Sequence, residues 1–414
     1  VLGTEASAAV GASSLIVTCI LGAFTGLSVG VGVVTAKAVG SGNIGRLNQI
    51  IHCAAGLTCV LSLVFTVLGL IMAPEFLRWI QTPADVLENA TAYLRLYLLS
   101  LISIVSYNMG SGILRALGNT KSPTLYQLAG GIANIIGNTL FICFLDWGVQ
   151  GAALATACSQ GLAAFLIIRH LCTIKTPYRL RLRQLQINAS ICGQFLLVGI
   201  PAAIQSIVIT LSNLIVQAHI NQLGIDSMAA FTAYFKVENF IYLPIMAFGQ
   251  ACSTFTSQNI GANQVDRAKQ GVKTSLFLGI TVTISASVLT LCFSDFAFGL
   301  FSKEPAVIAL GTKIAFVAYP FYFIYVFLEV YASAIRGAGK ALPAMLIVVI
   351  NMCVVRTCIL KVVLHFYPNA LGVAAIYPLT WACTGLCLFL YYKSGGWFSA
   401  QTDVARKRIP VGQR

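Results

Sequence analysis

The sequence predicts an all-α, polytopic integral membrane protein, and three observations support that fold class. Hydrophobic residues make up 58% of the 414-residue chain, and charged residues only 9%. So few charges cannot cover the surface of a soluble domain of this size. Apolar stretches of more than about 20 residues recur along the chain, and each is long enough to cross a bilayer as a helix. They do not alternate between apolar and polar residues, as the strands of a membrane barrel do.

We expect eleven transmembrane helices, because inside lipid a helix pairs its backbone N–H and C=O groups within itself. Their boundaries follow the ends of the apolar stretches. Thr82-Pro83 and Ser122-Pro123 have the pattern of a capping residue followed by proline in the first helical turn. The expected spans are residues 9–37, 48–73, 88–115, 122–145, 150–172, 191–221, 228–259, 271–294, 306–334, 342–366 and 371–392.

The basic residues indicate the orientation of the chain. The formal net charge is +14, but Lys and Arg lie in every second loop rather than in one patch, which argues against a nucleic-acid partner. These loops and the tail contain Lys37, Arg46, Arg115, Lys121, Lys175, Arg179, Arg181, Arg183, Arg267, Lys269, Lys273, Arg336, Lys340 and Arg406. The other loops lean acidic. The positive-inside rule therefore predicts that the basic loops and the C-terminus are cytoplasmic.

An internal repeat divides the chain into two lobes. LGTEASAAVGA begins at Leu2 and LGIDSMAAFTA begins at Leu223, and this offset of 221 residues also aligns Arg46 with Arg267. Both copies start on the same side of the membrane, so the repeats are parallel. A helix precedes the second copy, and we expect a corresponding helix upstream of Val1. The expected parts are an N-terminal lobe at 1–172 with five of its six helices, a basic cytoplasmic linker at 173–190, a six-helix C-terminal lobe at 191–393 and a cytoplasmic tail at 394–414.

Several classes of enzyme are disfavoured by missing motifs. The chain contains no G-x-x-x-x-G-K-[ST] loop, no H-E-x-x-H pair and no C-x-x-C pair. The first absence excludes ATP hydrolysis through a P-loop, and the other two argue against zinc and redox sites. We therefore expect a protein that is not an enzyme and has no cofactor. If it pumps a solute, the energy comes from an ion gradient.

Four polar residues in the expected spans of the C-terminal lobe are candidates for the substrate cavity: Glu238, Gln250, Glu329 and Arg356. Placing such groups in a membrane is costly, so they are candidates for function. Glu238 either binds a cation or proton or pairs with a basic residue on a neighbouring helix. Glu329 either pairs with Arg356 or reaches the membrane interface. Arg356 has either that structural role or contacts substrate.

Two asparagines in the expected span 122–145, Asn134 and Asn138, are four residues apart and share one face of a helix. Thr156 in the next span can join them. Amide and hydroxyl oxygens suit a small cation, although a neutral set binds it weakly. The alternative is hydrogen bonding between helices, worth about 0.6 kcal/mol.

Glycines recur in the first expected span at Gly22, Gly26, Gly30 and Gly32. Small residues at this spacing allow two helices to approach closely. We predict that this face packs against another helix.

Several motifs, in this order, resemble the multidrug and toxic compound extrusion (MATE) family. They are LGTEASAAVGA, the Gly40, Gly42 and Asn43 that follow the first span, LRALGNTKSP, GVQGAALAT, GIP at 199–201 and QNIGANQ at 258–264. The resemblance covers nearly the whole chain and points to a bacterial branch of the family. It implies twelve helices in two six-helix lobes around a central cavity, in an antiporter that expels organic compounds while Na⁺ or H⁺ enters.

The resemblance also implies an ion-coupling site in the first lobe. That site uses an acid on the first helix, an Asn and an Asp four apart on the fifth helix, and a Thr on the sixth. The matching positions here are Asn134, Asn138 and Thr156, so that an asparagine replaces the usual aspartate; the first-helix acid would precede Val1. Another branch of the family places acids on the seventh and tenth helices, and of these only Glu329 has a match.

We therefore expect a secondary active antiporter that exports organic cations, drugs or amphipathic metabolites in exchange for Na⁺ or H⁺ by alternating access. The expected protein is a monomer in the bacterial inner membrane, and its partners are the bilayer, the small organic substrate and the coupling ion. The alternative is a flippase for a lipid-linked oligosaccharide or another amphiphile.

Overall fold

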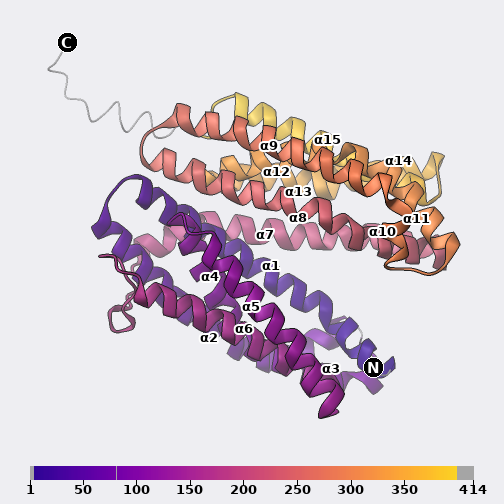
Figure 1. The fold of residues 1–414 in the computed structure, drawn as a ribbon, viewed down its shortest axis with the longest axis horizontal. Helices are drawn as coiled ribbons and strands as arrows, with labels where there is room; N and C mark the ends of the chain where they lie inside the picture. The colour runs from indigo at the N-terminus through magenta and orange to yellow at the C-terminus, as the bar shows by residue number, and fades with distance from the viewer. Residues whose placement is uncertain (1–3, 81, 399–414) are drawn as a thin grey trace. The chain divides into compact units, whose positions relative to one another are not determined.

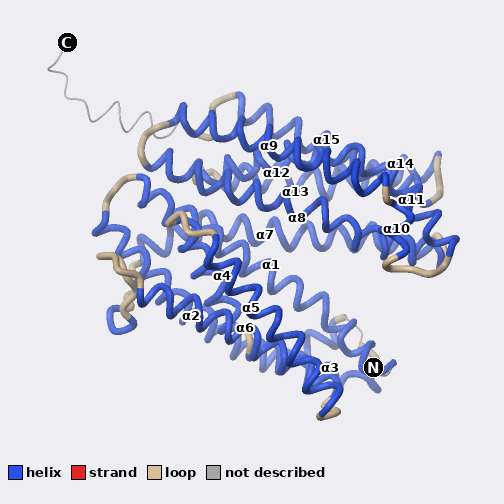
Figure 2. Tube along the Cα trace, viewed as in Figure 1, coloured by secondary structure: helices blue, strands red, loops and turns tan. Residues whose placement is uncertain are grey.

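The computed structural model describes residues 4–80 and 82–398, and these are helical apart from short connections (Figure 2). No strand occurs among the described residues. The chain divides into two compact units, Val1–Ser206 and Ile207–Arg414. We call them unit 1 and unit 2.

Unit 1 consists of long helices joined by short turns, coloured indigo to magenta in Figure 1. Its elements are α1 (Thr4–Gly40), α2 (Ile44–Trp79), α3 (Ala84–Leu99), α4 (Leu101–Ala116), α5 (Lys121–Asn138), the π-helix η1 (Thr139–Phe144), α6 (Gly148–Thr173), the short 3₁₀ helix η2 (Leu182–Gln184) and the first part of α7 (Ala189–Gln222). Helices α3 and α4 meet at Ser100 and together form one candidate membrane span, Val86–Ala116.

Unit 2 begins inside α7, and its helices are coloured from pink through orange to yellow in Figure 1. Its further elements are α8 (Ile225–Gly261), α9 (Val265–Cys292), α10 (Ser294–Gly299), α11 (Pro305–Ala318), the 3₁₀ helix η3 (Tyr319–Phe321), α12 (Tyr322–Gly337), α13 (Ala341–Val349), the π-helix η4 (Ile350–Val355), α14 (Arg356–Phe366) and α15 (Ala370–Lys393). Pro320 lies in η3, where it separates α11 from α12 within the span Pro305–Gly337.

Ten of the described helical stretches are long and apolar enough to cross a membrane. They correspond to ten of the eleven spans expected from the sequence. The remaining one, 228–259, lies within α8, a continuous helix of 37 residues. This helix is long enough to span, but polar residues such as Lys236, Glu238 and Gln250 leave it without a stretch as apolar as those of the other ten. The all-α, multi-spanning fold class is thereby confirmed.

Helix α7 belongs to both compact units, because its two parts pack on different helices. The first part packs on α1: a Cβ atom added at Gly26 would lie 2.2 Å from the backbone nitrogen of Ala203, and one at Gly30 would lie 2.2 Å from the carbonyl oxygen of Phe195. The predicted packing role of the α1 glycines is confirmed. The boundary between the units therefore falls at 206/207, later than the linker at 173–190 at which the sequence repeat divides the chain.

The core of unit 2 is rich in aromatic side chains. Tyr234 and Tyr319 stack with their ring centroids 5.1 Å apart, and Tyr322 meets Trp381 edge to face at 4.6 Å. All four side chains are almost fully buried. Such pairs stabilise a fold beyond the area that they bury. They also fix the rotation of α8, α12 and α15, and this determines which side chains face one another.

Candidate functional site

In unit 1, glycines bring α5 and α6 close enough for polar side chains to meet. A Cβ atom added at Gly130 would lie 3.1 Å from the carbonyl oxygen of Ser159, and one at Gly137 would lie 3.1 Å from the Cβ atom of Ala155. These glycines are two helical turns apart, and Asn134 lies between them on the same face. Its amide is therefore directed at α6.

The three residues expected to couple ions are in contact. Asn134 Nδ2 donates to Thr156 Oγ1 and to Ser159 Oγ, each at 3.4 Å. Asn138 Nδ2 donates to Asn134 Oδ1 at 3.0 Å. Thr156 Oγ1 donates in turn to the carbonyl of Ala152 at 3.0 Å. The asparagine, threonine and serine side chains form one neutral cluster, which we call the amide cluster.

The amide cluster can supply neutral oxygen ligands to a cation. Its side chains are Asn134, Asn138, Thr156 and Ser159, and none of them carries a charge. Among the described residues, no group of three or more His, Cys, Asp or Glu side chains could hold a metal ion. Hard cations prefer oxygen ligands and bind more tightly when some of these are carboxylates. The amide cluster alone is therefore a weak cation site, and its internal hydrogen bonds also join α5 to α6.

In unit 2, Glu238 lies on α8 and is partly buried. Tyr322, the first residue of α12, donates its hydroxyl to Glu238 Oε1. Among the described residues, this is the only hydrogen bond that Glu238 accepts, and no basic side chain lies within ion-pair distance. Lys236 is exposed and lies near the ring of Phe301, 5.6 Å from its centroid. The structure thus provides Glu238 with a phenol rather than a cation.

A run of aromatic rings connects Glu238 to Arg356. Tyr322 contacts Trp381, and Trp381 contacts Tyr377 with ring centroids 6.1 Å apart. The guanidinium carbon of Arg356 lies 5.3 Å from the centroid of the Tyr377 ring. The carboxyl and the guanidinium are therefore parts of one buried region, which we call the aromatic site.

Arg356 is buried, with 3% of its surface exposed. Its Nη1 donates to Asn213 Oδ1 at 2.8 Å, and its Nη2 lies 3.0 Å from the sulfur of Met352. Its Nε is buried and has no hydrogen-bond partner. No described carboxylate lies within 4.0 Å of the guanidinium.

One of the two alternatives predicted from the sequence, a pair between Glu329 and Arg356, does not form. Glu329 pairs instead with Arg336 on its own helix, at 2.9 Å, and also accepts a hydrogen bond from Ser333 Oγ at 2.8 Å. These residues follow Glu329 at positions i+4 and i+7, which lie on the same face of α12. The pair is buried, and Gly249 of α8 leaves room for it: a Cβ atom there would lie 2.6 Å from Glu329 Oε1. This arrangement gives Glu329 a structural role.

Gln250 is separated from the aromatic site along the helix. It is exposed, and it follows Glu238 by twelve residues on α8. A helix rises 1.5 Å per residue, which places the two residues about 18 Å apart. The candidates Glu238 and Arg356 thus share one region, whereas Gln250 and Glu329 lie elsewhere on α8 and α12.

Sequence reasoning did not identify Tyr322, Trp381, Tyr377 and Asn213 as parts of this region. Aromatic residues are common in membrane helices, so no local pattern distinguishes these three. Asn213 did carry a signal, because it is an amide within the apolar segment LSNLIV. Ser159, three residues after Thr156, also follows from helical spacing.

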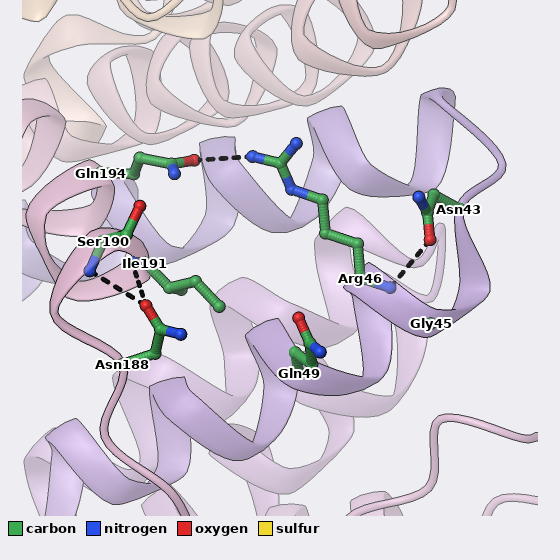
Figure 3. Close-up of a pocket in the computed structure, with 8 residues that line it drawn as sticks. All are labelled: Asn43, Gly45, Arg46, Gln49, Asn188, Ser190, Ile191 and Gln194. Atoms are coloured by element: carbon green, nitrogen blue, oxygen red, sulfur yellow. Dashed lines mark hydrogen bonds between the residues drawn. The ribbon is translucent and has the colours of Figure 1, made fainter.

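A surface pocket of about 500 Å³ lies at the beginnings of α2 and α7 in unit 1 (Figure 3). Arg46 Nη2 donates to Gln194 Oε1 at 3.1 Å. Asn43 accepts from the backbone N–H of Arg46, and Asn188 accepts from that of Ser190. The first N–H groups of both helices are thus already capped. The pocket contains none of the candidate residues.

The chain matches known proteins over most of its length. The family model MatE matches residues 1–140 and 201–360. The probable multidrug resistance protein YpnP of Bacillus subtilis is 28% identical over 408 residues, which cover 96% of this chain and 88% of the relative. An FAD transporter of Shewanella oneidensis is 26% identical over 361 residues, which cover 85% of this chain and 78% of the relative.

Solved structures confirm the fold. A crystal structure of MATE in the straight conformation superposes with a TM-score of 0.89 at 21% identity, covering 97% of this chain and 90% of that one. The resemblance inferred from the sequence motifs therefore agrees with both kinds of comparison.

Proposed function

Because the chain belongs to the MatE family of multidrug and toxic compound extrusion transporters, we propose that it is a secondary active antiporter. It exports organic cations, drugs or amphipathic metabolites and takes up H⁺ or Na⁺ in exchange. The family and the relatives are those of transporters, not enzymes. Transport proceeds by alternating access, in which each ligand shifts the equilibrium only by its difference in affinity for the two states.

The observation that carries the coupling proposal is the Glu238–Tyr322 contact in unit 2. A proton requires a single titratable group, and Glu238 supplies it. Na⁺ requires several oxygen ligands, whereas Tyr322 is the only described side chain that forms a hydrogen bond with Glu238. The geometry therefore favours H⁺ as the ion at Glu238. A cationic substrate and a proton would compete for the same carboxyl.

The amide cluster of unit 1 is a second proposed ion site. Its oxygens suit Na⁺ in kind, and Asn134, Asn138 and Thr156 are the residues to which the family resemblance assigns coupling. The cluster has no carboxylate of its own, so we expect a smaller contribution from it. The two sites make opposite predictions about the coupling ion, and this allows one experiment to separate them.

The relatives bear on the substrate. One is named a probable multidrug resistance protein and another an FAD transporter. Drugs and FAD are both amphipathic, with aromatic parts. Buried aromatic rings between two charged groups, as in the aromatic site, fit molecules of this kind. The flippase alternative receives no support from these relatives, and we do not propose it.

The protein is a multi-pass membrane transporter. We propose that it functions as a monomer in the bacterial cell membrane with a cytoplasmic C-terminus. The relative in Bacillus subtilis supports the cell membrane, and the alternation of basic and acidic loops supports the orientation.

Efflux of ethidium from proteoliposomes tests this function. The wild-type protein is compared with Glu238→Gln and Asn134→Ala under an imposed proton gradient and, separately, an imposed Na⁺ gradient. We expect efflux driven by the proton gradient, and its loss in Glu238→Gln. Efflux that only a Na⁺ gradient drives, and that Asn134→Ala abolishes, would move the coupling to unit 1. No gradient-dependent efflux across a panel of organic cations would refute the exporter.

A further inference from the structure

Arg356 is a buried cation that no described carboxylate contacts directly. It is 3% exposed, and no described carboxylate lies within 4.0 Å of it. A guanidinium has five N–H donors. One donates to the amide oxygen of Asn213, one points to the sulfur of Met352, which is a weak acceptor, and the Nε–H has no partner.

This state is costly in a membrane-spanning helix. A buried charge normally requires a partner of opposite sign and hydrogen bonds for its remaining donors. Arg356 has a single oxygen ligand, and that ligand is neutral. The two acids in the middle of α8 and α12 form hydrogen bonds or an ion pair with other side chains. Glu238 accepts from Tyr322, and Glu329 is paired with Arg336.

The backbone next to Arg356 and its guanidinium both contact α7. Arg356 directly follows the π-helix η4, and π-helical turns are frequent at functional sites. Ser212 of α7 donates its hydroxyl to the carbonyl of Met352 in η4. The next residue on α7 is Asn213, so one turn of α7 contacts both the π-helix and the guanidinium.

Of the two described side chains that contact the Nη atoms of Arg356, Asn213 is exposed and Met352 is buried. The amide oxygen of Asn213 holds the position on Nη1 that an oxyanion would prefer, because charge-assisted contacts of arginine with carboxylate or phosphate are stronger and often bidentate. The side chain of Asn213 is exposed. If it rotates away from the guanidinium toward its exposed side, Nη1 becomes free for an incoming oxygen. The Nη2 and Nε groups have no competing oxygen ligand.

We propose that Arg356 binds an oxyanion, a carboxylate or phosphate group, of an amphipathic substrate, which displaces the amide oxygen of Asn213. This inference rests on the proposed export function and narrows its substrate class. The ring of Tyr377 lies beside the guanidinium and adjoins Trp381, so an anionic group that reaches Arg356 lies next to aromatic side chains. The aromatic site then accepts molecules that carry a negative group as well as cations.

Three dansyl compounds with one fluorophore test the proposal by direct binding to the purified protein. Dansylglycine carries a carboxylate, dansylglycinamide is its neutral counterpart, and dansylcadaverine carries an amine. We expect dansylglycine to bind about tenfold or more tightly than dansylglycinamide, as expected for a hydrogen bond to a charged group. Arg356→Gln should remove this difference. Equal binding of the two compounds to the wild-type protein would overturn the proposal.

Substitutions of Asn213 separate ligand binding from a structural role of Arg356. Asn213→Asp places a carboxylate against the guanidinium, so dansylglycine binding should be lost while thermal stability is kept or raised. Asn213→Ala removes the oxygen that the ligand must displace, so binding should be kept or strengthened. If both variants weaken dansylglycine binding equally, Arg356 serves only the fold. Lys236→Gln, which removes an exposed cation of the same unit, is the matched control and should change nothing.

The oxyanion can belong to a dissolved solute or to a lipid headgroup. Phosphatidylglycerol vesicles that displace dansylglycine from the wild-type protein would assign the site to a lipid phosphate, and a lack of displacement would assign it to a solute.

Ethidium efflux is measured on the same variants. Efflux that persists in Arg356→Gln, together with lost dansylglycine binding, supports both proposals. If Arg356→Gln keeps both efflux and dansylglycine binding, the oxyanion site is refuted and the proposed export function is not.

Discussion

The two units hold polar groups inside apolar helices in different ways. In unit 1, Asn134, Asn138, Thr156 and Ser159 are neutral and satisfy one another through hydrogen bonds. In unit 2, Glu238 and Arg356 are ionisable and remain separate, with aromatic rings between them. A satisfied neutral cluster holds helices together at little cost. An incompletely paired ionisable group is costly, and it persists where a ligand, an ion or a proton completes it. We therefore place the main coupling group in unit 2.

Unit 2 also contains an internal control for this comparison. Glu329 and Arg336 are also largely shielded from solvent, but they form a direct ion pair at 2.9 Å. This pair is complete and needs no ligand. Burial of charge alone therefore does not mark a site, and the incomplete pairing of Glu238 and Arg356 is the informative feature.

The largest effect is expected from Glu238→Gln. The side-chain amide of the introduced glutamine is close in size to the carboxyl and can still accept a hydrogen bond from Tyr322, but it cannot release a proton. Efflux driven by a proton gradient should fall about tenfold or more, whereas ethidium exchange across vesicles without a gradient should continue. Glu238→Asp, which keeps the titratable group, should retain gradient-driven efflux. Equal loss of both modes in Glu238→Gln would show a damaged transporter rather than an uncoupled one.

Breaking the complete ion pair should affect stability instead of coupling. Arg336→Gln leaves the carboxylate of Glu329 buried without its cation, at a cost of about 3–5 kcal/mol. The melting temperature in detergent should fall, while gradient dependence per folded molecule stays unchanged. The double variant Glu329→Gln with Arg336→Gln removes both charges and should recover much of the lost stability. A change of coupling ion in either variant would contradict the structural role of this pair.

A third change gives the neutral amide cluster of unit 1 an ionisable group, such as unit 2 has in Glu238. Asn138→Asp introduces the carboxylate that the family resemblance leads one to expect at this position. The amide of Asn134 can rotate to donate to it, and the cluster then offers both charge and oxygen ligands. Thermal stabilisation by Na⁺ relative to K⁺, absent or small in the wild-type protein, should appear in this variant. Strong Na⁺ stabilisation of the wild-type protein would show that the neutral cluster already binds the ion.

The smallest effect is expected from Asn134→Ala. It removes hydrogen bonds between α5 and α6, which are worth about 0.6 kcal/mol in membrane proteins. Proton-driven efflux should therefore change by no more than about threefold. Thr156→Ala is the matched variant on the opposite helix and should behave alike. A loss as large as that of Glu238→Gln would reverse the ranking of the two units.

The sequence predicts the helices well, because the length of an apolar stretch determines whether that segment can span the bilayer. It predicts side-chain pairs only where helical spacing or the repeat relates them. Asn134 and Asn138 share a face by spacing, and the family resemblance adds Thr156. Tyr322 follows Glu238 by 84 residues, and their contact depends on the rotation of α8 against α12, which no local pattern encodes.

The pairing of Glu329 with Arg336 rather than with Arg356 has a physical cause. The sequence places Arg336 in a cytoplasmic loop of the basic set, which leaves Arg356 as a buried cation within reach of Glu329. In the structure, α12 continues to Gly337, so that Arg336 lies in its last turn. At this position it can reach back two turns to Glu329. Apolar length does not determine the last residue of a helix, and here one more turn of α12 gives Glu329 a different ion-pair partner.

The central claim is that Glu238 exchanges a proton for the substrate. The most direct test is the release of protons when ethidium is added to the purified protein in weakly buffered solution. We expect the wild-type protein and Asn134→Ala to release protons as ethidium binds, and Glu238→Gln to bind ethidium without release. Undiminished proton release by Glu238→Gln would contradict the claim and place the coupling group elsewhere in the chain.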